Sequence, residues 1–161
     1  MIGISVIAGY YQYKKLLSLS AAVNRSKNRP TYVIGGYGPT PDPEYFMEKT
    51  GADVVVMGEG EETTVELFEA FEKKQSLSGI LGIAWKDGNA VNINPRRGVI
   101  EDVDSIAWPA YDLFPIENYR MMREPGCENS DFLLPMMSGR GCTFKCTFCY
   151  RMDPGYRVRS P

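Results

Sequence analysis

The first 75 residues alternate between strand-like and helix-like patterns, and this alternation limits the possible folds more than any other feature. Apolar β-rich runs, helical spacing and helix-end residues predict strands near 2–8, 31–35 and 53–57, and helices near 13–26, 43–50 and 61–74. Strands that alternate with helices of this size form parallel sheets with helices on their faces. We therefore expect an α/β domain over residues 1–75, built as a partial Rossmann-like (flavodoxin-like) parallel sheet.

A hairpin signal follows this alternation. Two strand-like runs between residues 80 and 95 flank Asp87-Gly88, a pair typical of two-residue hairpin turns. We assign residues 76–129 to a linker that contains this β-hairpin. Residues 130–161 then begin another domain, whose first strand we expect in the stretch "DFLLPMMSGRG". A sheet of three strands is small, so we expect the chain to be a fragment that begins and ends inside domains.

Three of the four cysteines stand close together in the segment "GRGCTFKCTFCYRM", at positions 142, 146 and 149. Three thiolates on one tight loop can hold three irons of a four-iron cluster and leave the fourth iron open to a substrate or cofactor. A zinc site with Cys127 as fourth ligand is an alternative, as are three unconnected thiols. The chain has no histidine, so Ser-His-Asp and Cys-His catalysis are excluded, and sulfur or oxygen must hold any metal.

Charge and hydropathy bear on the partners and the compartment. The net charge of −2 argues against a nucleic-acid partner. No apolar run approaches the roughly 20 residues that a membrane span needs, and no basic residues precede the N-terminal apolar run, as they would in an export signal. We therefore expect a cytoplasmic protein without a membrane span, in which close-set thiols bind metal more often than they form disulfides.

Glycine-rich segments follow the three predicted parallel strands. The segments are "GISVIAG", "GGYGPT" and "MGEGEE". The carboxyl ends of the strands form the ligand-binding edge of an open α/β sheet, and glycine lets a ligand approach the backbone closely. Glycines also end strands where no ligand binds, so their spacing alone leaves both interpretations open.

The cysteine segment carries a resemblance to a known family. "CTFKCTFCY" resembles the CxxxCxΦC signature of radical S-adenosylmethionine (radical SAM) enzymes, whose (β/α) barrel begins with the strand before the first cysteine. In that family the three cysteines bind a [4Fe-4S] cluster, and S-adenosylmethionine chelates the fourth iron and is cleaved reductively. The resemblance implies that Cys142, Cys146 and Cys149 bind the cluster. It also implies that Phe148 and Tyr150 lie near S-adenosylmethionine.

The front of the chain resembles the cobalamin (B12)-binding domain that precedes the barrel in many radical SAM enzymes of the class B methyltransferase type. The resemblance rests on the order SxxxG, GGxxPT and TGADxVxxGEGE. It implies that three short segments border cobalamin: Ser5, Val6 and Ile7; Gly35 and Gly36; and Gly58, Glu59 and Gly60. Gly38 stands where many relatives carry histidine, so one contact of the family is missing.

Together, these resemblances imply methyl transfer to an unactivated carbon or phosphorus, or a related radical rearrangement, in a full-length enzyme. The partners would be a small-molecule substrate and an electron donor such as flavodoxin or ferredoxin. We expect this chain alone to be inactive, and we identify no side chain as a general acid or base. Two alternatives remain open: a non-catalytic cobalamin-binding module, and a zinc-stabilised α/β interaction protein.

Overall fold

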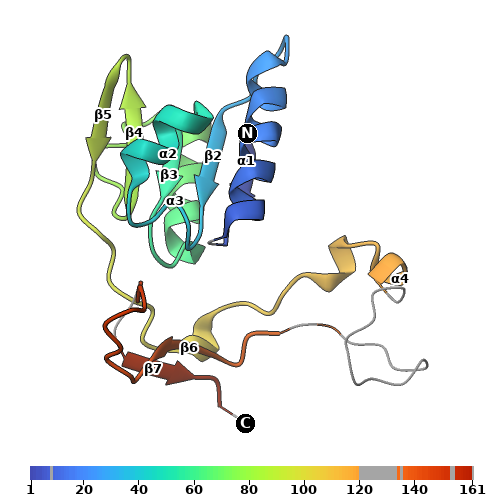
Figure 1. Cartoon of the computed structure of the whole chain (residues 1–161), viewed down its shortest axis with the longest axis vertical. Coiled ribbons are helices and arrows are strands. Elements are labelled where there is room, and N and C mark those ends of the chain that lie inside the picture. Colours follow the sequence, from blue (N-terminus) through green and yellow to red (C-terminus); the bar gives the residue numbers. More distant parts are fainter. Residues whose placement is uncertain (8, 120–133, 135, 153–154, 161) are drawn as a thin grey trace.

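The computed structural model describes residues 1–7, 9–119, 134, 136–152 and 155–160 (Figure 1). In chain order its elements are β1 (Ile2–Ser5), α1 (Tyr10–Arg25), β2 (Tyr32–Gly35), α2 (Pro43–Thr50), β3 (Val54–Val56), α3 (Glu61–Glu72), β4 (Ile83–Asp87), β5 (Ala90–Ile93), the 3-10 turns Val103–Ser105 and Tyr111–Leu113, α4 (Ile116–Tyr119), β6 (Gly139–Cys142) and β7 (Gly155–Val158).

Five strands form one sheet in the order β1-β2-β3-β4-β5. The first three strands are parallel, and their register places Ser5 beside Gly35 and Gly35 beside Val56. Their carboxyl ends therefore meet at one edge of the sheet. The three strands, the three helices between and after them, and the α/β class confirm the prediction from the sequence.

The predicted hairpin is present, and it extends the same sheet. β4 pairs antiparallel with β3, and β5 pairs antiparallel with β4. The turn residues are Gly88 and Asn89, one position later than predicted, because Asp87 still pairs with Ala90 in the ladder. Gly88 has φ +58°, the positive value that the first loop residue of a type I′ or II′ hairpin turn requires. The domain division at residue 75 stays a prediction.

Helix α2 shows how local signals set an element's ends. The Asp42 side chain accepts a hydrogen bond from Tyr45 N at 3.1 Å, and Pro43 occupies the first turn. Gly51 ends the helix in the left-handed region, with φ +70°. These are standard beginning and ending residues of a helix, which is why the predicted bounds 43–50 match the structure.

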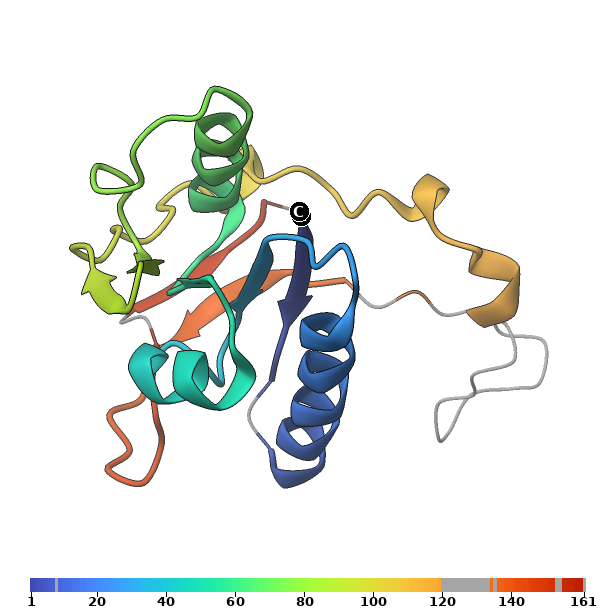
Figure 2. The same ribbon diagram turned by 90° about the horizontal axis from the view of Figure 1, so that it is seen from above.

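Helices α1 and α2 cover one face of the sheet and α3 covers the other (Figure 2), and an apolar cluster packs against each face. On one face, Leu16 of α1 and Met47 of α2 pack against strand residues that include Ile34. On the other face, Leu67 and Ala70 of α3 pack against β2, β3 and β4. Neither cluster includes a β1 residue on the α3 side of the sheet, so α3 leaves that part of the face uncovered.

The strands β6 and β7 form a separate antiparallel hairpin beyond the carboxyl ends of the parallel strands (Figure 1). The predicted strand in residues 131–141 lies partly outside the described residues. Where the structure describes the chain, β6 begins only at Gly139 and ends at Cys142. Its assignment to the start of a (β/α) barrel stays a prediction. No helix in the described ranges is long and apolar enough to span a membrane.

Candidate cofactor site

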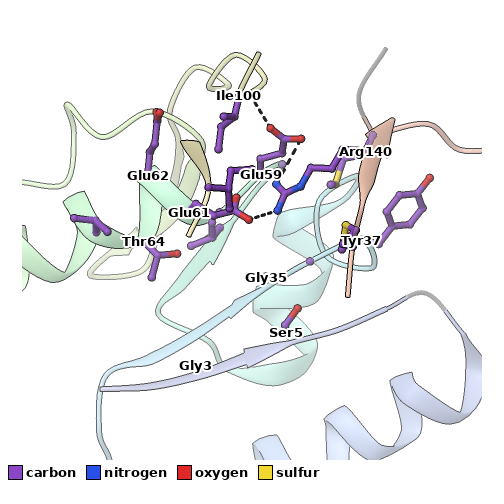
Figure 3. A pocket seen from close by; sticks show the side chains of 18 of the residues that line it. Gly3, Ser5, Gly35, Tyr37, Glu59, Glu61, Glu62, Thr64, Ile100 and Arg140 are labelled. Carbon is purple, nitrogen blue, oxygen red and sulfur yellow. Dashed lines mark hydrogen bonds and ion pairs between the residues drawn. The ribbon is translucent and has the colours of Figure 1, made fainter. Parts of the chain in front are cut away.

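A cavity of about 1440 Å³ lies between the parallel strands and the β6–β7 hairpin (Figure 3). Its lining from the sheet side includes Gly3, Ser5, Gly35, Gly36, Tyr37, Gly58, Glu59 and Gly60, with Val65 and Phe68 of α3. Its lining from the hairpin side includes Arg140, Cys142, Cys149 and Tyr150. Pockets for drug-sized molecules measure roughly 300–1,000 Å³, so this cavity has room for a larger ligand.

Strand β1 leaves the cavity wall open because two of its residues have little or no side chain. Gly3 and Ser5 lie two positions apart on β1 and so point to the same face of the sheet. A Cβ built on Gly3 would meet no atom within 4 Å. The Val65 and Phe68 side chains of α3, both more than half exposed, line the same space. The wall therefore offers apolar surface without filling the volume.

Thr40 links the loops that follow β2 and β3. Its buried hydroxyl donates to Gly36 O at 2.8 Å and accepts from Gly58 N at 3.2 Å. The two glycine segments are thus joined by one side chain of "GGYGPT". This link fixes the relative position of the loops at the edge of the sheet.

Gly36 is required by the fold itself. Its φ is +93°, and a Cβ at this position would lie 2.8 Å from Val6 O and 2.9 Å from Ser5 Oγ. A side chain there would therefore clash with β1 before any ligand is bound.

The Gly36→Val variant is expected to lose stability in the absence of ligand. Overpacking costs about 1–3 kcal/mol, and a left-handed backbone adds about 1–2 kcal/mol for a residue with a Cβ. Urea denaturation of the apo protein measures this loss as a lower midpoint. Gly3→Val is the matched control and should keep the wild-type midpoint. A Gly36→Val midpoint equal to that of the control would contradict the predicted clash.

The structure brings most of the predicted cobalamin-binding residues together. Ser5, Gly35, Gly36, Gly58, Glu59 and Gly60 all line the cavity. Val6 instead has a buried side chain in the α1–α2 core, and Ile7 is 73% exposed; neither is among the lining residues. A role for any of the eight residues as a cobalamin contact stays a prediction.

The cysteine loop faces the same cavity with two of its three thiols. Cys142 and Cys149 line the cavity, whereas Cys146 is exposed on the loop between them. Within the described ranges, no three Cys, His, Asp or Glu side chains are close enough together to hold a metal ion. Cys127, the fourth ligand in the zinc alternative, lies outside the described residues. Metal binding by the three cysteines stays a prediction.

The two predicted S-adenosylmethionine contacts lie in different surroundings. Tyr150 lines the cavity, while Phe148 is 90% exposed and is not among the lining residues. The Tyr37 hydroxyl donates to Tyr150 O, and the two rings meet edge to face with centroids 5.3 Å apart. The loop after β2 therefore touches the residue that follows Cys149. Contact of Phe148 and Tyr150 with S-adenosylmethionine stays a prediction.

Glu59 carries a buried carboxylate whose partners are groups of the protein. Arg157 Nη2 lies 2.7 Å from Glu59 Oε1, and Arg157 Nη1 lies 3.1 Å from Oε2. The backbone N–H of Ile100 donates to Oε2 at 2.7 Å. Burial alone would raise the pKa of Glu59. The hydrogen bonds from Arg157 and Ile100, with the charges of Arg157 and Arg140, outweigh burial and hold the pKa below its usual value.

Arg140 adds a second cation to this group (Figure 3). It forms an ion pair with Glu61, and its Nη1 lies 3.6 Å from Glu59 Oε1. Burial tends to raise the pKa of Glu61, but the hydrogen bond and charge of Arg140 hold it below its usual value. In turn, the hydrogen bond to Glu61 raises the pKa of Arg140. The side chains of Glu59, Glu61 and Arg140 are therefore charged near neutral pH.

Many lining residues were absent from the sequence-based prediction, among them Gly3, Tyr37 and Arg140. Gly3 could have been found, because it lies two positions before Ser5 on the same strand face. Tyr37 stands inside the glycine segment and could also have been included. Arg140 gave no such signal, since its pairing with Glu61 joins positions 79 residues apart in sequence.

The edge with its three glycine-bearing loops corresponds to a known family. The model of the B12 binding domain matches residues 1–68. These residues are a B12-binding domain. The match includes β1, β2, β3 and the loops after them, so the family supports cobalamin binding by this part of the chain.

Curated relatives extend beyond the B12-binding domain into the rest of the chain. An uncharacterized methyltransferase of Pyrococcus horikoshii is 37% identical over 131 residues, which are 80% of this chain and 27% of that protein. The anaerobic magnesium-protoporphyrin IX monomethyl ester cyclase of Cereibacter sphaeroides is 36% identical over 123 residues, 73% of this chain and 19% of that protein. The chain thus spans about a quarter or less of the length of these two relatives.

A solved structure shows the same fold as the B12-binding domain and the segments after it. It is the cobalamin-dependent S-adenosylmethionine radical enzyme OxsB with aqua-cobalamin and S-adenosylmethionine bound. The TM-score is 0.70 at 24% identity, over 99% of this chain and 21% of that chain. At this identity the likeness shows the fold, a mixed α/β arrangement similar to that part of a cobalamin radical SAM enzyme.

Proposed function

We propose that this chain is the cofactor-holding part of a cobalamin-dependent radical SAM enzyme that carries out methyl transfer or a related radical rearrangement. One observation carries the proposal. The strand ends of the B12-binding domain and two cysteines of the CxxxCxΦC loop line one cavity. An enzyme that uses both cofactors on one substrate must bring them together, because proximity is what the protein contributes to cofactor chemistry.

The sheet side of the cavity fits cobalamin. The open wall at Gly3, the short Ser5 side chain and Gly35 leave room for a large ligand against the sheet edge. The chain has no histidine, so it has no imidazole that could bind cobalt. We propose that the chain holds cobalamin by shape and by backbone contacts at these loops.

The hairpin side fits an iron–sulfur cluster by its donors. Cys142, Cys146 and Cys149 are free thiols on one loop, and thiolates are the usual protein ligands of such clusters. In the structure the three cysteines are not close enough together to hold a metal ion. We therefore propose that the loop around Cys146 moves when a cluster assembles. Tyr150 would then lie near S-adenosylmethionine at the cavity, and Phe148 would reach it from the moving loop.

When bound, these cofactors supply a methyl carrier and a reductively generated radical; the residues of the chain hold them and exclude water and oxygen. The reduction needs an electron donor, for which we propose flavodoxin or ferredoxin. The substrate would be a small molecule that enters the cavity between the two cofactors.

The proposal is tested by anaerobic reconstitution of the chain with iron and sulfide, followed by hydroxocobalamin and gel filtration. The expected product carries about four irons and one corrinoid in each chain. Corrinoid without iron would support the non-catalytic cobalamin-binding module instead. Zinc in place of iron, without corrinoid, would support the zinc-stabilised protein.

A further inference from the structure

Glu59 lies between the loop after β3 and the β6–β7 hairpin. Its side chain is only 4% exposed, and that of Arg157 on β7 is 9% exposed. The two carboxylate oxygens face the two terminal nitrogens of Arg157, at 2.7 and 3.1 Å. Two parallel charge-assisted hydrogen bonds of this kind fix orientation as well as distance. The carboxylate is therefore held toward the hairpin.

Further bonds complete the surroundings of this pair. Ile100 N donates to Glu59, and Ile100 O accepts from Arg157 Nη1 at 2.5 Å, so one backbone residue contacts both partners. On the cavity side, Arg140 of β6 pairs with Glu61 and approaches Glu59 (Figure 3). Each strand of the hairpin thus sends one arginine to the "GEGE" loop of the B12-binding domain.

Apolar packing contributes little to the position of the hairpin. Neither hydrophobic cluster in the described part of the chain contains a residue of β6 or β7. Other contacts of the hairpin and its ends among the described residues are polar or aromatic, such as Ser160 N to Asp104 and Arg159 over the ring of Trp108. Among the described residues, the Glu59–Arg157 ion pair is therefore the most buried salt bridge between the hairpin and the domain.

We propose that Glu59 is a positioning residue, which ties the cysteine hairpin to the cobalamin side of the cavity through Arg157 and is a ligand of neither cofactor. This inference rests on the proposed function, because the Glu59–Arg157 ion pair would serve to hold the cluster loop facing the corrin. It revises the expectation from the sequence that Glu59 itself borders cobalamin. Glu59 lines the cavity together with Gly58 and Gly60, but its carboxylate oxygens are bonded to Arg157 and Ile100.

Hydrogen exchange of the apo chain tests the tie without any cofactor. Glu59→Gln should speed exchange of the amides of residues 139–142, 155–158 and Ile100 by about tenfold or more. The substitution removes the negative charge of a buried ion pair and leaves the charge of Arg157 without this counter-ion. Glu69→Gln is the matched control. It is the same substitution on α3, in an exposed pair with Lys73, and should leave these amides unchanged.

A pair of substitutions at Arg157 separates charge from packing. Lysine and methionine have similar lengths, but only lysine keeps the positive charge. Arg157→Lys should retain part of the hairpin protection, and Arg157→Met should lose as much as Glu59→Gln. The double variant Glu59→Gln/Arg157→Met should exchange no faster than either single variant, as expected for two halves of one interaction. Equal protection in Arg157→Lys and Arg157→Met would overturn the tie.

Titration of hydroxocobalamin distinguishes a positioning residue from a ligand. If Glu59 acts through Arg157, Glu59→Gln and Arg157→Met should change the corrinoid affinity by the same factor. A larger loss in Glu59→Gln, with the hairpin still protected, would show that Glu59 is a ligand and would overturn the inference. A wild-type chain that binds no corrinoid would refute the proposed function instead, and the exchange data would still decide whether the tie exists.

Discussion

Replacement of Cys142, Cys146 or Cys149 by alanine is expected to abolish assembly of the iron–sulfur cluster. Each thiolate would hold one iron, and the chain has no histidine that could take over as a ligand. The measurement is iron and sulfide content, with the visible absorption of the chain, after anaerobic reconstitution. We expect about four irons in the wild type and only background iron in each single variant.

Cys127→Ala is the control for these three variants and should reconstitute like the wild type. A loss of iron in Cys127→Ala equal to that in the other three would contradict the three-cysteine account and favour a four-cysteine site. Because we assign cobalamin to the strand ends on the other side of the cavity, each cysteine variant should also keep its corrinoid binding without a cluster. The experiment thereby separates the two cofactors.

Gly3→Ile is expected to weaken binding of hydroxocobalamin by about tenfold or more. Gly3 lines the cavity, and an added Cβ meets no atom within 4 Å. The isoleucine side chain would therefore fill volume that we assign to the ligand. Overpacking of about 1–3 kcal/mol corresponds to roughly 5- to 150-fold in affinity. A β-branched residue also suits a strand, so the fold should survive. The measurement is the shift of the corrin absorption bands during titration.

Gly79→Ile is the matched control for this variant. Gly79 likewise has no atom within 4 Å of an added Cβ, and it does not line the cavity. Its corrinoid affinity should equal that of the wild type. Wild-type affinity in Gly3→Ile would mean that cobalamin binds away from β1.

Local signals made most of the B12-binding domain predictable. The cap at Asp42 and the glycine at position 51 determine where α2 begins and ends, and neither depends on distant residues. The pairing of β4 with β3 was not predicted. It places Val54 opposite Trp85, and local sequence patterns do not indicate which distant strand pairs with which. The sequence therefore predicted the hairpin but not its place in the sheet.

The sequence predicted the glycines and cysteines of the candidate site, but it did not predict which of the charged residues pair with one another. The order of strand ends led to Ser5, Gly35 and Gly36, because parallel strands bring their carboxyl ends together. The role of Glu59 as a cobalamin contact stays a prediction, whereas its ion pair with Arg157 could not be predicted, because the two residues stand 98 positions apart and no local pattern indicates the pair. The spacing of the cysteines indicates a shared metal, but spacing does not determine how the loop closes around it.

The central claim is that cobalamin and the cluster bind on opposite sides of one cavity. Electron paramagnetic resonance tests it most directly, because cob(II)alamin and a reduced [4Fe-4S] cluster each carry an unpaired electron. In the chain loaded with both cofactors, we predict that dipolar coupling splits or broadens the two signals. The coupling should disappear in Cys142→Ala loaded with corrinoid alone. A spectrum equal to the sum of the two separate signals, with both cofactors bound, would contradict the account.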